Sequence, residues 1–580
     1  MHSRFRRWAG ILGLIVVPAL TLGLAGCVGI PRSGAVHAGQ PIVQADSNGF
    51  DLNYSPSGPV TGATQEEILR GFIDAASSPQ QGYAVAREFL APDFSSSWQP
   101  DESVTVDRET GRDYSQLDAT TMQLAVSPVA DVDVSGNYTT VNAAAPVIFR
   151  YQFVSVTINK KKEWRLKSAP NGTVLDQTKF ASVFTAHPLY FYSPDFSYLV
   201  PDLRWFPSRA STATRIVKAL LAGAAPWLAK AVVSAFPNGT QLSLDSVPVN
   251  ASRAQVDLSA EANGADQATM QRMVLQLSKS LIDVTSVSSI EVSIQGNQKS
   301  VEDLAPGSGP ITDPPVDIRP LVLRNGQFGL LSTNGSDLKQ LPGLSAKVAA
   351  LKPQAVTVSA DQSAAAVLAA GGVYSVSTAA DTPALVDARP GLIPPSLDVY
   401  GYLWSVPAAL PGQLHATAPD GAAVAVQTPW PDASSIVSLQ VARDGTRLIA
   451  LLRSGTDTRL VAASIVRGGE RNAPRQLGPL MELTAGSGTP RAATWVDELT
   501  VATLTTTRPD GSAVAVQQLG GQNSSVAGPN HAVTLVGAGT VPRYWLLTSD
   551  NTLQGPRGTG WQQKADDIDL IATQLGTPVG

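Results

Sequence analysis

One cysteine supplies the strongest candidate for chemistry in this chain of 580 residues. Cys27 is the only cysteine, and a lone cysteine is usually a buried thiol that reacts with nothing. The residues before it indicate a different use. Met1–Arg7 carry three arginines and no acid, and a mostly apolar run over Trp8–Leu22 follows. A positive segment followed by an apolar segment is typical of a secretory signal peptide.

The tetrapeptide Leu24-Ala25-Gly26-Cys27 resembles a lipobox, the cleavage motif of bacterial lipoproteins. This resemblance implies removal of residues 1–26 as the signal peptide, with S-diacylglyceryl and N-palmitoyl groups on Cys27. Two acyl chains make a stable anchor, at about 0.8 kcal/mol per buried CH₂. An uncleaved anchor is disfavoured, because a membrane span needs ~20 apolar residues and this run is shorter. We therefore predict a lipoprotein held on the outward, extracytoplasmic face of the cell membrane.

Histidines are the next candidates for chemistry, and their spacing favours none. Removal of the signal peptide leaves His37, His187, His415 and His531, and no two lie at metal-ligand spacing. Motifs of zinc peptidases, serine hydrolases and phosphate-binding loops are absent from the sequence. We predict a protein without cofactor, metal or catalytic residues. A site assembled from distant residues remains the less favoured alternative.

Composition excludes some partners and limits the ways in which the chain is stabilised. The net charge is −5, and loss of three arginines with the signal peptide makes it −8, so nucleic acid is excluded as an expected partner. A secreted chain with one cysteine has no internal disulfide, and packing alone must hold it. The 49 glycines and 42 prolines favour many turns and strands.

Two α+β units are expected after a tether over residues 27–60, which is rich in Gly, Ser, Pro, Gln and Asn. In residues 61–184, Thr64 and Glu67 open a helix, a second helix follows, and strand-like runs come next. This order looks like an NTF2-like fold. Lys160, Lys161 and Lys162 lie between two of the strands. A solvated hairpin turn is favoured there over a contact with anionic lipid.

Residues 187–300 form the second unit, with an amphipathic helix over Thr212–Ala222, a helical stripe from Met270 to Leu281, and a last strand over Ser289–Ile294. Residues 320–580 show a repeat. Pro419–Gln427 recurs as Pro509–Gln517 after 90 residues, about two propeller blades. We predict an all-β propeller of five or six four-stranded blades. A β-sandwich is disfavoured by this period.

Several motifs of the second unit resemble a GerMN domain. They are Tyr190-Phe191, Leu199-Val200-Pro201, the leucine-rich helix that ends at Gly223, Phe236-Pro237-Asn238-Gly239-Thr240 and Val256-Asp257-Leu258-Ser259. With the lipobox and the order of the units, they make the whole chain similar to the LpqB family of actinobacterial lipoproteins. The resemblance implies a partner, the extracellular domain of the sensor histidine kinase MtrB, within a two-component system that controls cell-wall homeostasis and division.

Two other functions stay open. The chain could bind cell-wall glycan or peptidoglycan, or, less favoured, act as an envelope hydrolase. Four tryptophans of the propeller are candidate binding residues, because exposed tryptophans often dominate interfaces: Trp404, Trp430, Trp495 and Trp545. Packing between the blades is nevertheless favoured for most of them.

Overall fold

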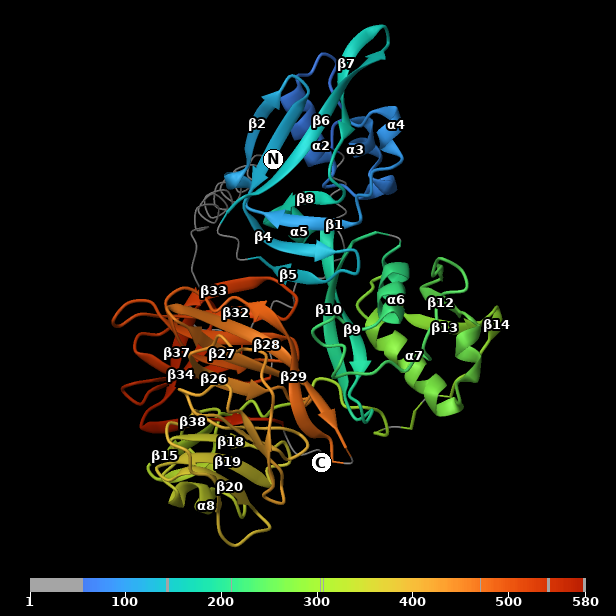
Figure 1. Ribbon diagram of the computed structural model, residues 1–580. Coiled ribbons are helices and arrows are strands. Elements are labelled where there is room, and N and C mark those ends of the chain that lie inside the picture. The colour runs from blue at the N-terminus through green and yellow to red at the C-terminus, as the bar shows by residue number, and fades with distance from the viewer. Residues whose placement is uncertain are drawn as a thin grey trace, which may run out of the picture. The chain divides into compact units, whose positions relative to one another are not determined.

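The computed structural model describes residues 56–141, 145–209, 211–302, 304–305, 307–469, 471–539 and 543–576. The predicted signal peptide, Cys27 and the tether up to residue 55 lie outside the described residues. The described chain is multidomain, with two α+β regions followed by an all-β region (Figure 1). Within the described ranges, no helix has the length and apolar character needed to cross a bilayer.

Short helices open the first region. They are α2 (Gln65–Ala75), η1 (Gln80–Gly82), α3 (Ala84–Glu88) and α4 (Pro92–Ser95). The predicted helix start is confirmed, since the Thr64 hydroxyl accepts the N–H of Glu67, and the Glu67 carboxylate accepts the N–H of Thr64 at 2.8 Å. One face of α2, including Leu69 and Phe72, is buried. That face is what fixes the helix against the sheet behind it.

Two four-stranded sheets complete this region. The first has the order β2 (Asp113–Asp118), β3 (Thr121–Val126), β6 (Val147–Ile158), β7 (Lys161–Ser168), and the second has the order β5 (Tyr138–Thr140), β4 (Pro128–Asp133), β1 (Ser103–Asp107), β8 (Thr173–Asp176). η2 (Glu109–Gly111) joins β1 to β2, and α5 (Gln177–Val183) follows β8. Phe72 of α2 packs against Trp98 and Tyr151 over the first sheet. Phe180 of α5 packs over the second sheet.

A long antiparallel hairpin begins the second region. β9 (Phe184–Tyr192) and β10 (Leu199–Pro207) pair along their whole length. The expected boundary between the first two units, at residues 184–187, therefore lies inside β9. Trp205 of β10 packs against Tyr138 and Phe180 of the first region, with ring centroids 5.9 and 5.0 Å away. The hairpin thus belongs to the cores of both regions.

The remainder of the second region packs two helices on a small mixed sheet. Its elements are α6 (Thr212–Ala222), β11 (Val249–Asn250), β12 (Arg253–Leu258), η3 (Ala260–Gly264), α7 (Gln267–Leu281), β13 (Ser289–Ile294) and β14 (Asn297–Gln298). α6 and β13 have the predicted bounds, and Gly223 ends α6 with φ 101°. The predicted methionine stripe of α7 is a core stripe, since Met273 and Leu277 are fully buried.

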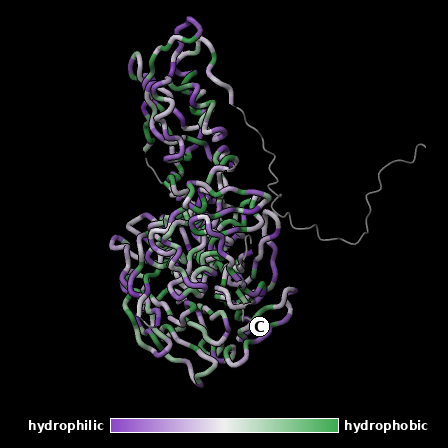
Figure 2. The backbone as a smooth tube through the Cα atoms, turned by 90° about the vertical axis from the view of Figure 1, so that its right-hand side faces the viewer, coloured by the Kyte–Doolittle hydropathy of each residue, from purple (hydrophilic) through white to green (hydrophobic). Residues whose placement is uncertain are grey.

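The all-β region is a closed propeller of six four-stranded blades within residues 321–574, which resolves the predicted choice of five or six. Blade 1 combines the last described strand, β38, with the first three strands of the region. Hydrophilic residues are frequent in the loops at the outside of the region (Figure 2). The blades are, in order from the innermost strand: β38 (Ile568–Gln574), β15 (Leu321–Arg324), β16 (Gln327–Leu331), β17 (Leu338–Lys339); β18 (Ala355–Val358), β19 (Ala364–Ala369), β20 (Gly372–Ser377), β21 (Ala384–Asp387); β22 (Ser396–Leu397), β23 (Leu403–Ser405), β24 (His415–Thr417), β25 (Ala423–Ala425); β26 (Ser435–Val441), β27 (Arg447–Ser454), β28 (Asp457–Gly468), β29 (Ala473–Leu483); β30 (Thr489–Trp495), β31 (Thr500–Thr506), β32 (Ser512–Gln518), β33 (Asn523–Ala527); β34 (Ala532–Gly537), β35 (Tyr544–Thr548), β36 (Leu553–Arg557), β37 (Gly560–Ala565).

The innermost strands contact one another in a ring, β38-β18-β22-β26-β30-β34 and back to β38. Antiparallel pairing of β38 with β15 joins the two ends of the region, which leaves no blade open at the closure. β38 also pairs in parallel with β18, so blades 1 and 2 form one continuous eight-stranded sheet. The helix α8 (Ser345–Ala350) connects these two blades.

The predicted repeat is two blades apart but not in register. Pro419–Gln427 spans the turn between the third and fourth strands of blade 3, whereas Pro509–Gln517 spans the turn between the second and third strands of blade 5. A true repeat occurs between the first and second strands, where an aspartate carboxylate accepts backbone N–H groups from two to four residues ahead. It recurs in four blades, at Asp361, Asp398, Asp444 and Asp497.

Candidate functional site

The residues predicted to do chemistry are not gathered into one site. Cys27, its lipobox neighbours and His37 lie outside the described residues. His187 is buried in β9, where burial lowers its pKa to about 4. His415 lies in β24, and exposed His531 faces Asp510, so the three described histidines belong to different elements. Nowhere in the described ranges do three His, Cys, Asp or Glu side chains form a potential metal site.

Three of the four candidate tryptophans are core residues. Trp404, Trp430 and Trp495 are at most 4% exposed. Each indole N–H donates to a protein oxygen: Trp404 to the Asp398 carboxylate at 2.9 Å, Trp430 to the Pro411 carbonyl at 3.1 Å, and Trp495 to the Gln440 carbonyl at 3.2 Å. Packing between blades is thus the structural outcome for these three. Trp545 differs, because it is half-buried and lines a pocket.

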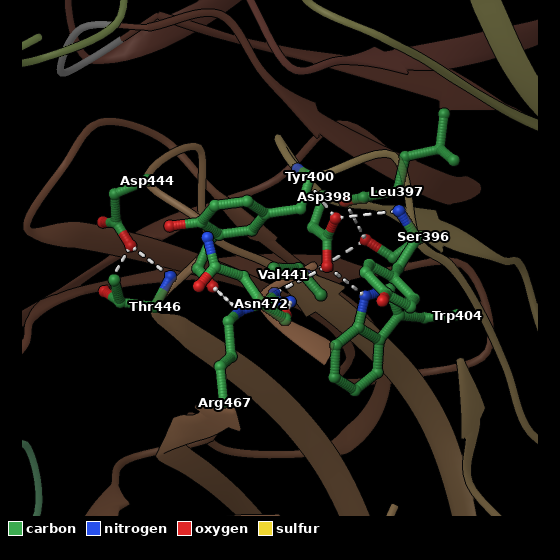
Figure 3. Close-up of polar contacts among 12 residues, drawn as sticks. Ser396, Leu397, Asp398, Tyr400, Trp404, Val441, Asp444, Thr446, Arg467 and Asn472 are labelled. Atoms are coloured by element: carbon green, nitrogen blue, oxygen red, sulfur yellow. Dashed lines mark hydrogen bonds and ion pairs between the residues drawn. The ribbon is translucent and has the colours of Figure 1, made fainter. Parts of the chain in front are cut away.

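A fully buried ion pair joins blades 3 and 4 (Figure 3). Asp398 Oδ2 accepts from the Trp404 indole and from Arg467 Nη2, the latter at 2.6 Å. Oδ1 accepts the N–H groups of Tyr400 and Tyr402 at 3.0 and 2.9 Å. Arg467 of β28 also donates to two backbone carbonyls, and its guanidinium lies 4.5 Å from the Tyr400 ring centroid. Both charges are therefore surrounded by partners, as a buried pair requires.

A second buried arginine joins the propeller to the hairpin β9–β10. Arg447 of β27 forms an ion pair with Asp444 and donates to the carbonyl of Glu498 at 2.8 Å. It also donates to the carbonyl of Pro201 in β10 at 3.3 Å. One side chain therefore links blade 4, blade 5 and the second region.

Two further hydrogen bonds hold the hairpin against the propeller. The Tyr190 hydroxyl of β9 donates to Glu498 Oε1, and the Trp205 indole of β10 donates to the carbonyl of Gly520, both at 2.8 Å. Gly520 has φ 74°, and a Cβ there would lie 3.1 Å from the Leu203 carbonyl oxygen. The close approach of the hairpin thus depends on glycine at this turn.

We call the contacts that Arg447, Tyr190 and Trp205 make between the hairpin and the propeller the hairpin joint. Carboxylates outnumber arginines around it. Asp313, Asp444, Asp497 and Glu498 line a gap of about 10 Å³ together with the two arginines Arg443 and Arg447. Burial raises the pKa of Glu498 and of Asp313, and lowers the pKa of Arg443 to about 10. Glu498 Oε2 is buried with no hydrogen-bond partner among the described residues. The joint therefore carries an electrostatic cost that the Asp398–Arg467 pair does not.

Two larger cavities lie within the propeller. The central channel has a volume of about 160 Å³ and is lined by all six innermost strands or their leading residues. Asp569 is the sole ionisable side chain among its described lining residues. Hydrolysis of a glycoside generally uses two carboxylates, so this channel lacks the pair that such chemistry needs.

The second cavity, the seam pocket, lies between blades 6 and 1 and has a volume of about 260 Å³. Its described lining includes the cations Arg543 and Lys564 beside Trp545, with no carboxylate. Apolar walls with a few hydrogen-bond donors suit the binding of a small acceptor-rich molecule. No carboxylate is available among the described lining residues to act as a general base.

Neither the contact of Arg467 with Asp398 nor the contact of Arg447 with Pro201 was predicted from the sequence. The turns that contain Asp398, Asp444 and Asp497 each join the first and second strands of a blade. Arg467 lies 69 residues from Asp398 in the sequence, and Arg447 lies 246 residues from Pro201. A pattern within one segment therefore could not predict either contact.

Comparison with protein families assigns every region. The family described as "Lipoprotein LpqB, N-terminal domain" matches residues 58–181, "Sporulation and spore germination" matches 188–300, and "Lipoprotein LpqB beta-propeller domain" matches 329–569. The chain is 27% identical over 500 residues to Lipoprotein LpqB of Streptomyces coelicolor, covering 77% of this chain and 78% of that protein. It is 27% identical to the Streptomyces avermitilis protein of the same name, covering 80% of each.

Solved structures are more distant. The first GerMN domain of the sporulation protein GerM from Bacillus subtilis is 20% identical, covering 22% of this chain and 93% of that domain, with a TM-score of 0.16. A chain of a nidogen/laminin complex is 9% identical, covering 41% of this chain and 88% of that one, with a TM-score of 0.30. Likenesses of this extent carry no functional implication.

Proposed function

This chain belongs to the LpqB family of lipoproteins, and from that premise we propose that it is an anchored envelope protein that binds and modulates the sensor histidine kinase MtrB. In this proposal the lipid on Cys27 holds it at the outward face of the cell membrane. The chain would bias the kinase by binding one conformation of its extracellular domain more tightly than another. A tenfold shift between the two conformations needs about 1.4 kcal/mol of differential binding.

One observation carries this proposal, namely the hairpin joint. Arg447, Tyr190 and Trp205 connect the hairpin β9–β10 to blades 4 and 5 through hydrogen bonds of buried or half-buried groups. Such a joint presents the second region and the propeller to a partner as a fixed composite surface. The cavities add to this view, because neither contains a pair of carboxylates among its described lining residues. Binding suits this arrangement better than catalysis.

The direct test is a pull-down with the extracellular domain of the kinase, using the lipid-anchored chain in vesicles. We expect enrichment of the kinase domain well above that of an anchor fused to an unrelated protein. A Cys27→Ser chain made without residues 1–26 separates anchoring from recognition, because it has no anchor and should still bind the kinase domain in solution. Equal recovery on the unrelated anchored protein would remove the proposal.

The seam pocket favours a second candidate function, binding of cell-wall glycan or peptidoglycan. Trp545 offers an apolar ring, and Arg543 and Lys564 offer donors for carboxylate or hydroxyl groups. Co-sedimentation of the soluble chain with purified cell wall discriminates between the two. Pelleting that is lost in Trp545→Ala, with no binding to the kinase domain, would favour the wall. Turnover of wall fragments would be needed to support the hydrolase alternative.

A further inference from the structure

The hairpin of β6 and β7 extends beyond the sheet to which it belongs. β6 pairs with β3 only as far as Gln152, whereas its pairing with β7 continues to Ile158. Residues 153–158 therefore have one neighbouring strand instead of two. Asn159 and Lys160 form the turn, with φ of 50° and 66°. The end of this hairpin stands free of the other strands (Figure 1).

The tip carries unneutralised positive charge beside an apolar group. Lys160, Lys161 and Lys162 are all exposed, and their ammonium groups make no hydrogen bond or ion pair with another described residue. Ile158 is 37% exposed at the same end. Glu163, the next residue, does not neutralise them, because it is buried and accepts the N–H of Gly62 at 2.8 Å. Three cations and an apolar side chain thus face solvent together.

The same hydrogen bond shows where the chain from the N-terminus reaches the domain. Gly62 is bonded to the flank of the hairpin, one residue beyond the three lysines. Gly58 lies against Glu88, at which a Cβ would come within 2.5 Å of the carboxylate oxygen. Pro56 is 29 residues after Cys27, a distance of at most about 105 Å for a fully extended chain. The described chain therefore begins beside this hairpin, within reach of an anchor on Cys27.

We propose that the β6–β7 tip is a second membrane contact, which binds the anionic phospholipid headgroups of the leaflet that holds the anchor. The inference rests on the lipidation of Cys27 that the proposed function includes. Lysines near an anionic surface are attracted within a Debye length of it, and the anchor makes their encounter with that surface intramolecular. Ile158 adds apolar area at the interface. The contact fixes which side of the first region faces the bilayer.

The test uses the lipidated chain in vesicles of phosphatidylcholine, with or without phosphatidylglycerol. Because Cys27 is acylated, a cysteine introduced by Thr157→Cys is the one free thiol and takes a fluorophore. The control is the same label on a cysteine introduced by Ser524→Cys, at an exposed position in strand β33 of blade 5. We expect a quencher attached to lipid headgroups to quench the Thr157 label severalfold more in anionic than in neutral vesicles, and less as salt is raised. The Ser524 label should not distinguish the two vesicles.

A charge-matched pair of variants isolates the lysines. Lys160→Gln, Lys161→Gln and Lys162→Gln together should abolish the anionic preference, and should lower the partition of the unlipidated Cys27→Ser chain onto anionic vesicles by roughly 100-fold at low salt. The control replaces Lys230, Lys299 and Lys352, which are exposed elsewhere, and should change the partition far less. Equal thermal unfolding of the variants verifies that all remain folded.

Flotation separates failure of this inference from failure of the proposed function. Failure of the lipidated chain to float with either vesicle would mean that the anchor, and with it the inference, is wrong. Flotation with both vesicles but equal quenching of the two labels would overturn the tip contact and leave the anchor intact. Lysine-dependent binding to an anionic wall polymer, with none to anionic vesicles, would also overturn it.

Discussion

Two buried arginines hold this molecule together in different ways. Arg467 joins blades 3 and 4 inside the propeller, where Asp398 accepts four hydrogen bonds and both charges are at most 1% exposed. Arg447 joins the propeller to the hairpin β9–β10, and it is equally buried. Around Arg447, however, carboxylates outnumber cations, and Glu498 Oε2 has no partner among the described residues.

The difference separates a contact that builds a domain from one that connects domains. A buried pair stabilises only when hydrogen bonds satisfy its remaining donors and acceptors. Asp398 and Arg467 meet that condition, because each of them has several hydrogen-bond partners as well as the other's charge. The hairpin joint meets this condition only in part, because Glu498 Oε2 has no partner among the described residues. The stability of the joint therefore depends on the protonation of its buried carboxyl groups. The connection between regions is thus the adjustable part of the structure.

The largest effect is expected from Arg467→Ala. Removal of this side chain leaves the Asp398 carboxylate buried without its cation, at a cost of about 3–5 kcal/mol in the free energy of unfolding. Urea unfolding of the full chain, followed by tryptophan fluorescence, measures it. The double variant Asp398→Asn with Arg467→Met should recover part of the loss, because no lone charge remains. A loss below about 1 kcal/mol in the single variant would contradict the assignment.

Arg447→Ala should cost less, about 2–3 kcal/mol, because part of its loss falls on hydrogen bonds to neutral carbonyls. Asp444 keeps the N–H and hydroxyl of Thr446 as donors, which limits the cost of losing its cation. The expected signature is local. Hydrogen exchange should accelerate in β10 around Pro201, while β28 around Arg467 stays protected. Acceleration spread evenly over both strands would show that the two joints are not separate.

A smaller, pH-dependent effect is expected from Glu498→Gln. Burial raises the pKa of Glu498 above its ordinary 4.5, so the folded chain holds this proton at pH values where the unfolded chain has released it. Stability from this group is therefore full below pH 4.5 and is lost as the pH rises through the raised pKa. Glutamine keeps an oxygen for the Tyr190 hydroxyl and carries no charge.

Unfolding midpoints of the parent and Glu498→Gln, compared from pH 4 to 8, test this sign. As the pH rises, the free energy of unfolding of Glu498→Gln should increase relative to that of the parent. The increase should be smaller than the decrease that Arg447→Ala causes. Asp313, whose pKa is also raised by burial, and Asp444, Arg443 and Arg447 face the same gap and remain in both chains, so the difference isolates Glu498. A difference that stays constant with pH would show that Glu498 ionises normally in the folded chain.

Elements with a local signal were predicted well from the sequence. The helix α6 and the strand β13 have the bounds that a helical stripe and an alternating pattern predict. Thr64 and Glu67 announce their capping box within four residues. In each case the physical cause of the structure, a buried face or a cap, is contained in the segment itself.

Contacts between distant segments were beyond such patterns. The blade count stayed open because the most similar nonapeptides lie in different turns of blades 3 and 5. The hairpin joint was missed because Arg447, Glu498 and Pro201 are ordinary residues in their own segments, and only the fold brings them together. Three of the four tryptophans follow the packing that was favoured for them, but nothing local marks Trp545 as the one at a pocket.

The smallest effect is expected from Arg471→Gln, which tests whether burial is what separates these joints. Arg471 pairs with Asp420 and, like Arg467 with Asp398, bridges blades 4 and 3. Its side chain is 72% exposed and that of Asp420 is 48% exposed, so water and salt compensate for either charge. A backbone N–H of Ala422 also stabilises the Asp420 carboxylate and, with Arg471, lowers its pKa. The unfolding midpoint in urea should be unchanged within error, at low and at high salt. If Arg471→Gln destabilised the chain as much as Arg467→Ala, the position between the two blades, and not desolvation, would account for the strength of the buried pair.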